Sequence, residues 1–205
     1  MRRETAELDR LRNVPNTLLL GPSVDESIDR ATKRLLRGAD DEPTRTLVVT
    51  FVKGPGRWVE DWRRTVGDLP EELVITTTTD GFGGSELGDR TEENAGNVAT
   101  EYVSSPGDLT GLGMIIGKYL ERWYRTEGDI RVLFDSLTTI LQYGEPQGVF
   151  RFLHLITTRL DGANAAAYFL FDPDTQDSQT VAKIKSSFEA IAQLVDEDVW
   201  EVNQR

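Results

Sequence analysis

An acid and a hydroxyl follow directly after the most strand-like stretch of the sequence. Residues 130–139 read IRVLFDSLTT, so that a short apolar run with β-branched and aromatic character ends in Asp135 and Ser136. A continuous run of this kind is typical of a strand buried on both faces of a parallel sheet. In open α/β sheets, ligand-facing groups lie just beyond the carboxyl ends of the strands. Asp135 therefore lies where a nucleotide-binding protein would keep an acid that handles magnesium.

If no magnesium reaches this position, the carboxylate must be satisfied by donors from the protein itself. A buried acid without such partners would cost several kcal/mol in its charged form. We expect the donors to be Ser136, Thr138 and backbone amides of the following turn.

A second candidate group follows the strand predicted at 46–52. Residues 53–57 read KGPGR, which places Lys53 and Arg57 at the ligand-facing edge, where they could clamp an anion such as phosphate. The interpretation we favour is a glycine-bearing turn before a helix, because Pro55 removes one amide donor from the loop.

Three acids follow the strand predicted at 165–172. Asp172, Asp174 and Asp177 have the spacing D-x-D-x-x-D, and carboxylate oxygens suit calcium or magnesium. The glycine and terminal glutamate of an EF-hand are absent, so we favour solvated acids that cap a helix. His154 lies among apolar residues of a predicted helix, and we favour a core or surface histidine over a catalytic base. We expect no catalytic residue and no resident metal.

Composition narrows the class of protein. The chain has 205 residues, one histidine and no cysteine, which excludes disulfides and thiolate metal sites. No window approaches the roughly 18 to 20 apolar residues that span a bilayer, and the N-terminus lacks the apolar stretch of a secretory signal. We therefore expect a cytoplasmic protein that has no membrane segment.

The charge is strongly acidic. The formal net charge is −12, and the bases are 18 arginines and five lysines. An acidic, lysine-poor composition indicates a protein of a high-salt cytoplasm, where the Debye length falls to roughly 3 Å and self-repulsion is screened. The alternative is an ordinary acidic mesophilic protein. In both cases the charge opposes nucleic-acid binding, which normally needs a basic surface.

Strands and helices alternate along the chain. The predicted strands cover residues 17–20, 46–52, 73–79, 97–104, 131–135, 165–172 and, at an edge, 199–202. The predicted helices cover residues 23–37, 57–66, 108–125, 148–160 and 178–195. This alternation predicts a three-layer α/β/α sandwich with a mainly parallel central sheet. We expect a lead-in segment at 1–16, a single domain at 17–205, and an acidic, glycine-rich loop at 80–96.

The first helix has a recognisable start. Ser23 and Glu26 have the S-x-x-E spacing of a capping box, and we expect Val24 to lie on the inward side with Ile28. In the next helix, Trp58 and Trp62 are four residues apart, a spacing that favours core packing over a binding platform.

The order of these motifs resembles a known family. A first strand followed by G-x-S and a helix, then VLFDSLT, then RFLHLITTRL and a strand ending FLFDPDTQD is similar to the RecA superfamily, specifically KaiC-like ATPases and their haloarchaeal relatives. The resemblance spans roughly residues 17–200 and implies the P-loop NTPase fold. It also implies that VLFDSLT is the Walker B strand and that Asp135 is the acid that holds magnesium through water.

The sequence departs from this family at the phosphate loop. The loop should read G-x-x-x-x-G-K-[ST], whose amides wrap the phosphates and whose lysine reaches the terminal ones. Here residues 21–28 read GPSVDESI: the lysine and the magnesium-binding hydroxyl are both absent. The degenerate nucleotide site would consist of Gly21, Ser23, Ser27, Asp135 and Ser136. Two added acids, Asp25 and Glu26, would repel phosphates.

Three functions remain open. The first is a non-catalytic RecA/KaiC-like module that binds protein partners in signalling or regulation, self-associates into a homo-oligomer and needs no cofactor. The second is an atypical enzyme that binds or hydrolyses ATP with magnesium, using Lys53 or an arginine of a neighbouring subunit. The third and least favoured is a DNA-associated transcriptional regulator, which the acidic charge opposes.

Overall fold

The computed structural model describes residues 4–37, 43–79 and 97–204, with nothing given for the side chains of residues 4–6. The glycine-rich loop predicted at 80–96 lies outside the described residues. The strands are β1 (Asn16–Leu20), β2 (Thr44–Thr50), β3 (Glu72–Thr78), β4 (Val98–Val103), β5 (Asp129–Asp135), β6 (Ala166–Phe171), β7 (Ala190–Asp196) and β8 (Val199–Gln204). The α-helices are α1 (Glu4–Asp9), α2 (Glu26–Leu36), α3 (Pro55–Thr65), α4 (Leu109–Trp123), α5 (Leu137–Tyr143), α6 (Pro146–Gly162) and α7 (Ser178–Lys185).

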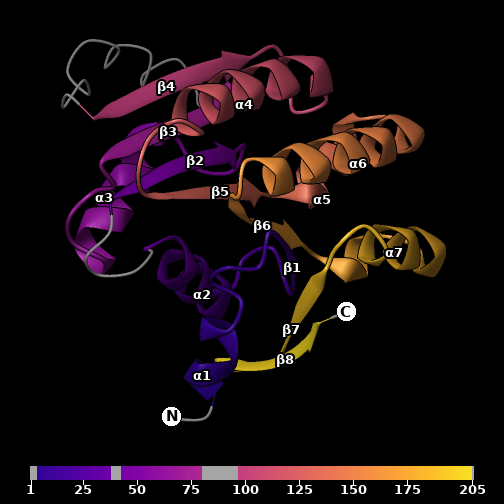
Figure 1. Ribbon diagram of the computed structural model, residues 1–205. Coiled ribbons are helices and arrows are strands. Elements are labelled where there is room, and N and C mark those ends of the chain that lie inside the picture. The colour runs from indigo at the N-terminus through magenta and orange to yellow at the C-terminus, as the bar shows by residue number, and fades with distance from the viewer. Residues whose placement is uncertain (1–3, 38–42, 80–96, 205) are drawn as a thin grey trace.

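The strands form one sheet between two layers of helices (Figure 1). Their order across the sheet is β4-β3-β2-β5-β6-β1-β7-β8. Every neighbouring pair is parallel except β7 and β8, which are antiparallel. The predicted three-layer α/β/α sandwich with a mainly parallel sheet is confirmed, and so is the predicted edge strand near 199–202.

Alternate residues of the central strands face the two helical layers. Leu18 and Leu47 lie in a hydrophobic cluster with α4, α5, α6 and α7. Leu19 and Val48, one residue further along each strand, lie in the cluster with α1, α2 and α3. Because side chains alternate across a strand, uninterrupted apolar runs are what a sheet covered on both faces requires. The two layers lie on opposite sides of the sheet in Figure 1.

The prediction of a helix over 178–195 is wrong in its second half. Helix α7 ends at Lys185, and residues 190–196 form β7. Ala190 and Ala192 are buried while Gln193 is exposed, and β7 pairs with β1 on one side and β8 on the other. Pairing with two strands distant in sequence outweighs the helical spacing of the apolar residues, because strand preference depends on its neighbours. The short helix α5, directly after Ser136, was not predicted.

The chain before β1 joins the core. Leu8, Leu11 and Val14 are buried in the cluster that contains α2. Arg131, on β5, is also buried and reaches the carbonyl oxygen of Arg12, with a second hydrogen bond to the Tyr168 hydroxyl at 3.0 Å. These bonds hold the N-terminal segment against the amino ends of the central strands.

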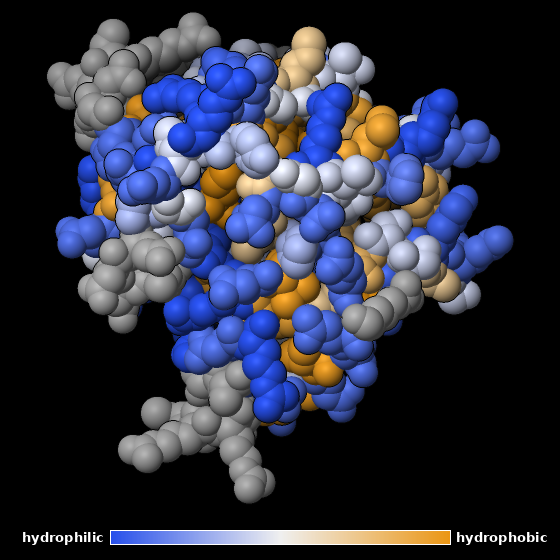
Figure 2. Space-filling view, viewed as in Figure 1, coloured by the Kyte–Doolittle hydropathy of each residue, from blue (hydrophilic) through white to orange (hydrophobic). Residues whose placement is uncertain are grey.

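Within the described ranges, no helix is both long and apolar enough to cross a bilayer. Figure 2 shows a surface that is mostly hydrophilic, with small hydrophobic areas between the polar side chains.

Candidate functional site

The candidate site lies at the carboxyl edge of the sheet, where β1, β2, β5 and β6 end. Asp135 is the last residue of β5, and Lys53 lies three residues after the end of β2. A cavity of about 730 Å³ opens between these residues and α2 and α3. Trp58, Leu133 and Leu170 provide apolar walls. The topology therefore brings Asp135 and Lys53 together, as the sequence predicts.

Asp135 is a partly buried carboxyl with few donors. Its neighbour in the β2–β5 register is Thr50, whose hydroxyl donates to the carboxylate at 3.4 Å. Burial raises the pKa of Asp135 to about 6, although the positive charge of Lys53 and the Thr50 hydrogen bond act in the opposite direction. The site therefore makes the charged form less favourable than it is in water, as expected for a carboxyl beside apolar residues.

The donors that we expected for Asp135 are engaged elsewhere. Ser136 caps α5 by accepting a hydrogen bond from the amide of Thr139. The Thr138 hydroxyl accepts the amide of Asp172 at 3.0 Å, from the end of β6. The expectation was wrong because the hydroxyls of Ser136 and Thr138 face other partners once a helix begins after Asp135. The hydroxyl that reaches Asp135 comes from Thr50, on the adjacent strand. The peptide bond between Asp135 and Ser136 is cis.

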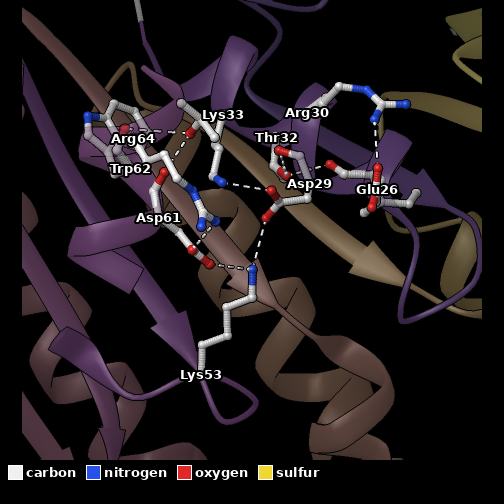
Figure 3. A network of polar contacts seen from close by, with 11 residues as sticks. Glu26, Asp29, Arg30, Thr32, Lys33, Lys53, Asp61, Trp62 and Arg64 are labelled. Carbon is white, nitrogen blue, oxygen red and sulfur yellow. Dashed lines mark hydrogen bonds and ion pairs between the residues drawn. The ribbon is translucent and has the colours of Figure 1, made fainter. Parts of the chain in front are cut away.

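Lys53 is held in an ion-pair network that crosses the cavity (Figure 3). Its Nζ lies 3.0 Å from the carboxylate of Asp29, on α2, and 3.3 Å from that of Asp61, on α3. Asp29 also binds Lys33 at 2.7 Å, and Asp61 binds Arg64 at 2.7 Å. The network links α2 to α3 and gives the Lys53 ammonium group two carboxylate partners from the chain itself.

The pKa values agree with this geometry. Burial opposes ionisation of Asp29, but hydrogen bonds from Lys33 and Lys53 outweigh it and hold the pKa of this carboxyl below its ordinary value. Burial likewise opposes the charge on Lys53, and the bonds to Asp29 and Asp61 outweigh it and raise the pKa of the ammonium group. Lys53 is thus held as a cation between two carboxylates, each of which it shares with a second basic residue.

The loop between β1 and α2 is held by hydrogen bonds within it and to residues that follow β6 and β7. Asp25 is the N-cap of α2 and accepts the amide of Ser27 at 2.7 Å. The amide of Ser23 donates to the Asp172 carboxylate at 3.1 Å. The Ser27 hydroxyl accepts the amide of Asp198 at 3.2 Å. Two loop amides that a phosphate would need therefore already donate to carboxylates of the protein.

The predicted capping box at the start of α2 is wrong. The cap is Asp25, while Ser23 lies outside the helix and Glu26 pairs with Arg30 at 3.3 Å. Val24 is 92% exposed and does not join the core. An aspartate directly before the helix outcompetes a serine two residues earlier, because the cap must reach the amides of the first turn. Gly21 has a packing role, since a Cβ there would lie 2.7 Å from Cδ1 of Ile28.

The acids after β6 act as caps. Asp172 accepts the amide of Asp174 at 3.1 Å, and Asp177 caps α7 by accepting the amides of Gln179 and Thr180. Hydrogen bonds from Thr180 hold the pKa of Asp177 below its ordinary value. Across the three described ranges, no group of three or more histidine or acidic residues could hold a metal ion. The candidate triad of Asp172, Asp174 and Asp177 is therefore not brought together as a metal site.

Two of the candidate residues from the sequence, Arg57 and His154, lie outside the cavity. Arg57 is exposed on α3, and His154 is exposed on α6. Trp58 and Trp62 stack with ring centroids 5.3 Å apart and are buried, which confirms the core-packing interpretation. Asp29, Lys33, Asp61 and Thr50 were missed by the sequence reasoning. The i,i+4 spacing of Asp29 and Lys33 is the signal that could have indicated an ion pair.

The fold and the site together define a three-layer α/β domain with a mainly parallel sheet and a cavity at the carboxyl edge of its strands. The chain belongs to a family of unknown function, DUF7504, whose model matches residues 15–194. No curated protein matches the sequence.

Solved structures resemble the chain in fold alone. A protein from Pyrococcus horikoshii OT3, solved in a structural study, superposes with a TM-score of 0.55 at 10% identity, covering 94% of this chain and 88% of that chain. A solved ATPase domain superposes with a TM-score of 0.54 at 13% identity, covering 94% of this chain and 75% of that chain.

Proposed function

We propose that this chain is a non-catalytic RecA/KaiC-like module that works by binding protein partners, in signalling or regulation, in a high-salt cytoplasm. In this proposal the sheet and its helices persist as a scaffold, self-association is retained, and no nucleotide is bound.

The observation that carries the proposal is the state of the phosphate loop. Productive phosphate binding needs free amides at the helix N-terminus and a lysine that reaches the phosphates. Here the Asp25 carboxylate occupies the end of α2, so a negative charge already fills the favourable field of the helix dipole. The nearest lysine after β2, Lys53, is bound by Asp29 and Asp61. An incoming phosphate would have to displace these carboxylates and then remain beside them.

The experiment is thermal unfolding of the full chain in about 2 M KCl, with and without millimolar magnesium-ATP. A ligand at one hundred times its dissociation constant stabilises a protein by about 2.7 kcal/mol, which is roughly 5 to 10 °C for a domain of this size. We expect no shift in Tm. An intact P-loop ATPase measured in parallel is the positive control for the assay.

A second candidate function is supported by one observation. The cavity of about 730 Å³ brings Asp135 and Lys53 to its lining, so a nucleotide could enter if Lys53 left its carboxylates. This atypical ATP-binding enzyme would show a magnesium-dependent rise in Tm that is lost in both Asp135→Ala and Lys53→Met. That result would replace the non-catalytic proposal.

A further inference from the structure

A second hollow lies beside the altered phosphate loop, on the side of α2 that faces β7. Its volume is about 500 Å³. Two segments form it, the loop at 22–27 and the end of β7 with the following turn at 194–197. Asp135 and Lys53 do not line this hollow.

Part of the lining of the hollow is apolar and open to solvent. Val24 is 92% exposed and Val195 is 47% exposed, and Pro22 and Leu194 line the same surface. Exposed apolar residues that gather inside a polar rim mark interaction sites, whereas single exposed ones need no explanation.

The rim is acidic on both sides. Asp25 and Glu26 lie on one side, and Asp196 and Glu197 lie on the other. The one cation in the lining is Arg30, whose guanidinium binds Asp198 at 2.9 Å and Glu26 at 3.3 Å. Its charge is therefore balanced within the protein, and the rim presents a net negative charge.

The two walls are tied together before any partner arrives. Arg30 bridges α2 to Asp198 in the β7–β8 turn, and the amide of Asp198 donates to the Ser27 hydroxyl at 3.2 Å. Asp198 has a φ of +55°, a left-handed conformation that suits a tight turn. A surface held in this way loses little conformational entropy on binding, which favours affinity.

We propose that this hollow, formed by residues 22–27 and 194–197, docks a basic segment of a partner protein. The segment would place one apolar side chain on Val24 and Val195 and flank it with arginine or lysine facing Glu26 and Glu197. The inference rests on the proposed function, since it names the surface through which a non-catalytic module would act.

Charge complementarity selects this occupant over others. Positive side chains meet the acidic rim, and complementary charge across an interface gives specificity and faster association. Phosphates, nucleic acids and anionic lipid headgroups would meet carboxylates at the rim. A second copy of this chain brings a net charge of −12 to the same place. At high salt the flanking ion pairs act only at contact distance, so the apolar contact must supply the remaining affinity.

The test uses the full ¹⁵N-labelled chain and a synthetic peptide of alternating arginine and leucine. Amide chemical shifts are followed during a titration in about 0.15 M and about 2 M KCl, which spans Debye lengths of roughly 8 to 2 Å. Two control peptides alternate glutamate with leucine and arginine with serine. We expect saturable shifts confined to residues 22–30 and 194–199, seen with the arginine–leucine peptide and absent with the glutamate–leucine peptide.

Three exposed substitutions make the test specific. Glu197→Lys should weaken binding roughly tenfold, because an attractive contact becomes a repulsive one. Val24→Ser should weaken it by a similar factor through lost apolar contact. Glu121→Lys, a charge reversal of an exposed residue on α4, is the matched control and should leave affinity unchanged within twofold.

Each other outcome counts against the proposal. Shifts spread over the acidic surface, or equal weakening by Glu121→Lys, would show non-specific charge attraction. No binding in either salt, or equal binding of the glutamate–leucine peptide, would also overturn it. Self-association in light scattering that Val24→Ser abolishes would assign the hollow to a second copy. A failure here alongside an unchanged Tm in magnesium-ATP would leave the non-catalytic proposal standing, so the two failures are distinguishable.

Discussion

Replacing Asp135 with asparagine should stabilise the protein at neutral pH. The pKa of this carboxyl is raised by burial from its ordinary 3.8 to about 6. Between about pH 4 and pH 6 the native protein therefore binds one more proton than the unfolded chain. The free energy of unfolding then falls as the pH rises through this window. Asparagine keeps the shape of the side chain and cannot ionise, so the penalty disappears.

The magnitude follows from the same values. The difference between 3.8 and about 6, at about 1.4 kcal/mol for each pH unit, gives about 3 kcal/mol as an upper value. Asp135 faces a cavity, and water that enters it lowers the penalty. We therefore expect Asp135→Asn to be more stable than the wild type by about 1 to 2 kcal/mol at pH 7.5 and equal to it near pH 4.

The assay is urea unfolding of both proteins from pH 4 to pH 8 at constant KCl. The control is Asp108→Ala, because Asp108 caps α4 by accepting the amide of Gly111 at 2.8 Å, which holds its pKa below the ordinary value. The stabilising effect of Asp108 is present at pH values above its pKa in the unfolded chain. It is lost only as the pH falls through the lower pKa that Asp108 has in the folded protein. Its removal should cost about 1 kcal/mol, constant from pH 5 to pH 8. A pH-independent difference for Asp135→Asn, or a loss of stability at pH 7.5, would refute the conclusion that burial of Asp135 outweighs its hydrogen bond from Thr50 and the charge of Lys53.

Three further changes test other parts of the structure. Lys53→Met should lower the free energy of unfolding by about 1 to 2 kcal/mol in urea unfolding, since it leaves two partly buried carboxylates with one partner fewer. The control Lys118→Met breaks an exposed pair with Glu101 and should cost under about 0.5 kcal/mol. Equal costs for the two variants would contradict the network around Lys53. Arg131→Met should cost about 3 to 5 kcal/mol by the same measurement, because Arg131 is fully buried and bound to Asp129 and Tyr168; a cost under about 1 kcal/mol would show that the N-terminal segment docks without it. Tm should rise steeply between low and molar KCl as repulsion within the net charge of −12 is screened, and a flat Tm in differential scanning calorimetry would indicate an ordinary mesophilic protein.

The sheet was predictable because its strands are continuous apolar runs. A run such as the one at 46–52 can be identified from the local sequence alone, and the structure contains β2 there, displaced by two residues. The segment at 190–196 was missed because its apolar residues fit a helical spacing as well. Its identity depends on pairing with β1 and β8, and neither pairing can be seen in a local stretch of sequence.

The position of the site could be predicted from the sequence, but the residues that bind Asp135 and Lys53 could not. A strand that ends in an acid places Asp135 at the carboxyl edge of the sheet, but its hydrogen bond to Thr50 depends on the β2–β5 register. The position of Lys53 was likewise predictable, while Asp29 and Asp61 come from two helices that only the tertiary fold brings together. Sequence patterns therefore identify which residues reach the edge, and the packing of α2 and α3 decides which charges remain available there.

The most direct test of the central claim is calorimetric titration of magnesium-ATP into the full chain in about 2 M KCl. We expect no saturable heat up to millimolar nucleotide, for the wild type and for Lys53→Met alike. The reason is that the Asp25 carboxylate occupies the end of α2 and that Asp29 and Asp61 hold Lys53. The contradicting result is a one-to-one isotherm with a Kd below about 1 mM, which corresponds to about −4.1 kcal/mol, and its loss in Lys53→Met. That result would identify the cavity at Asp135 as a nucleotide site.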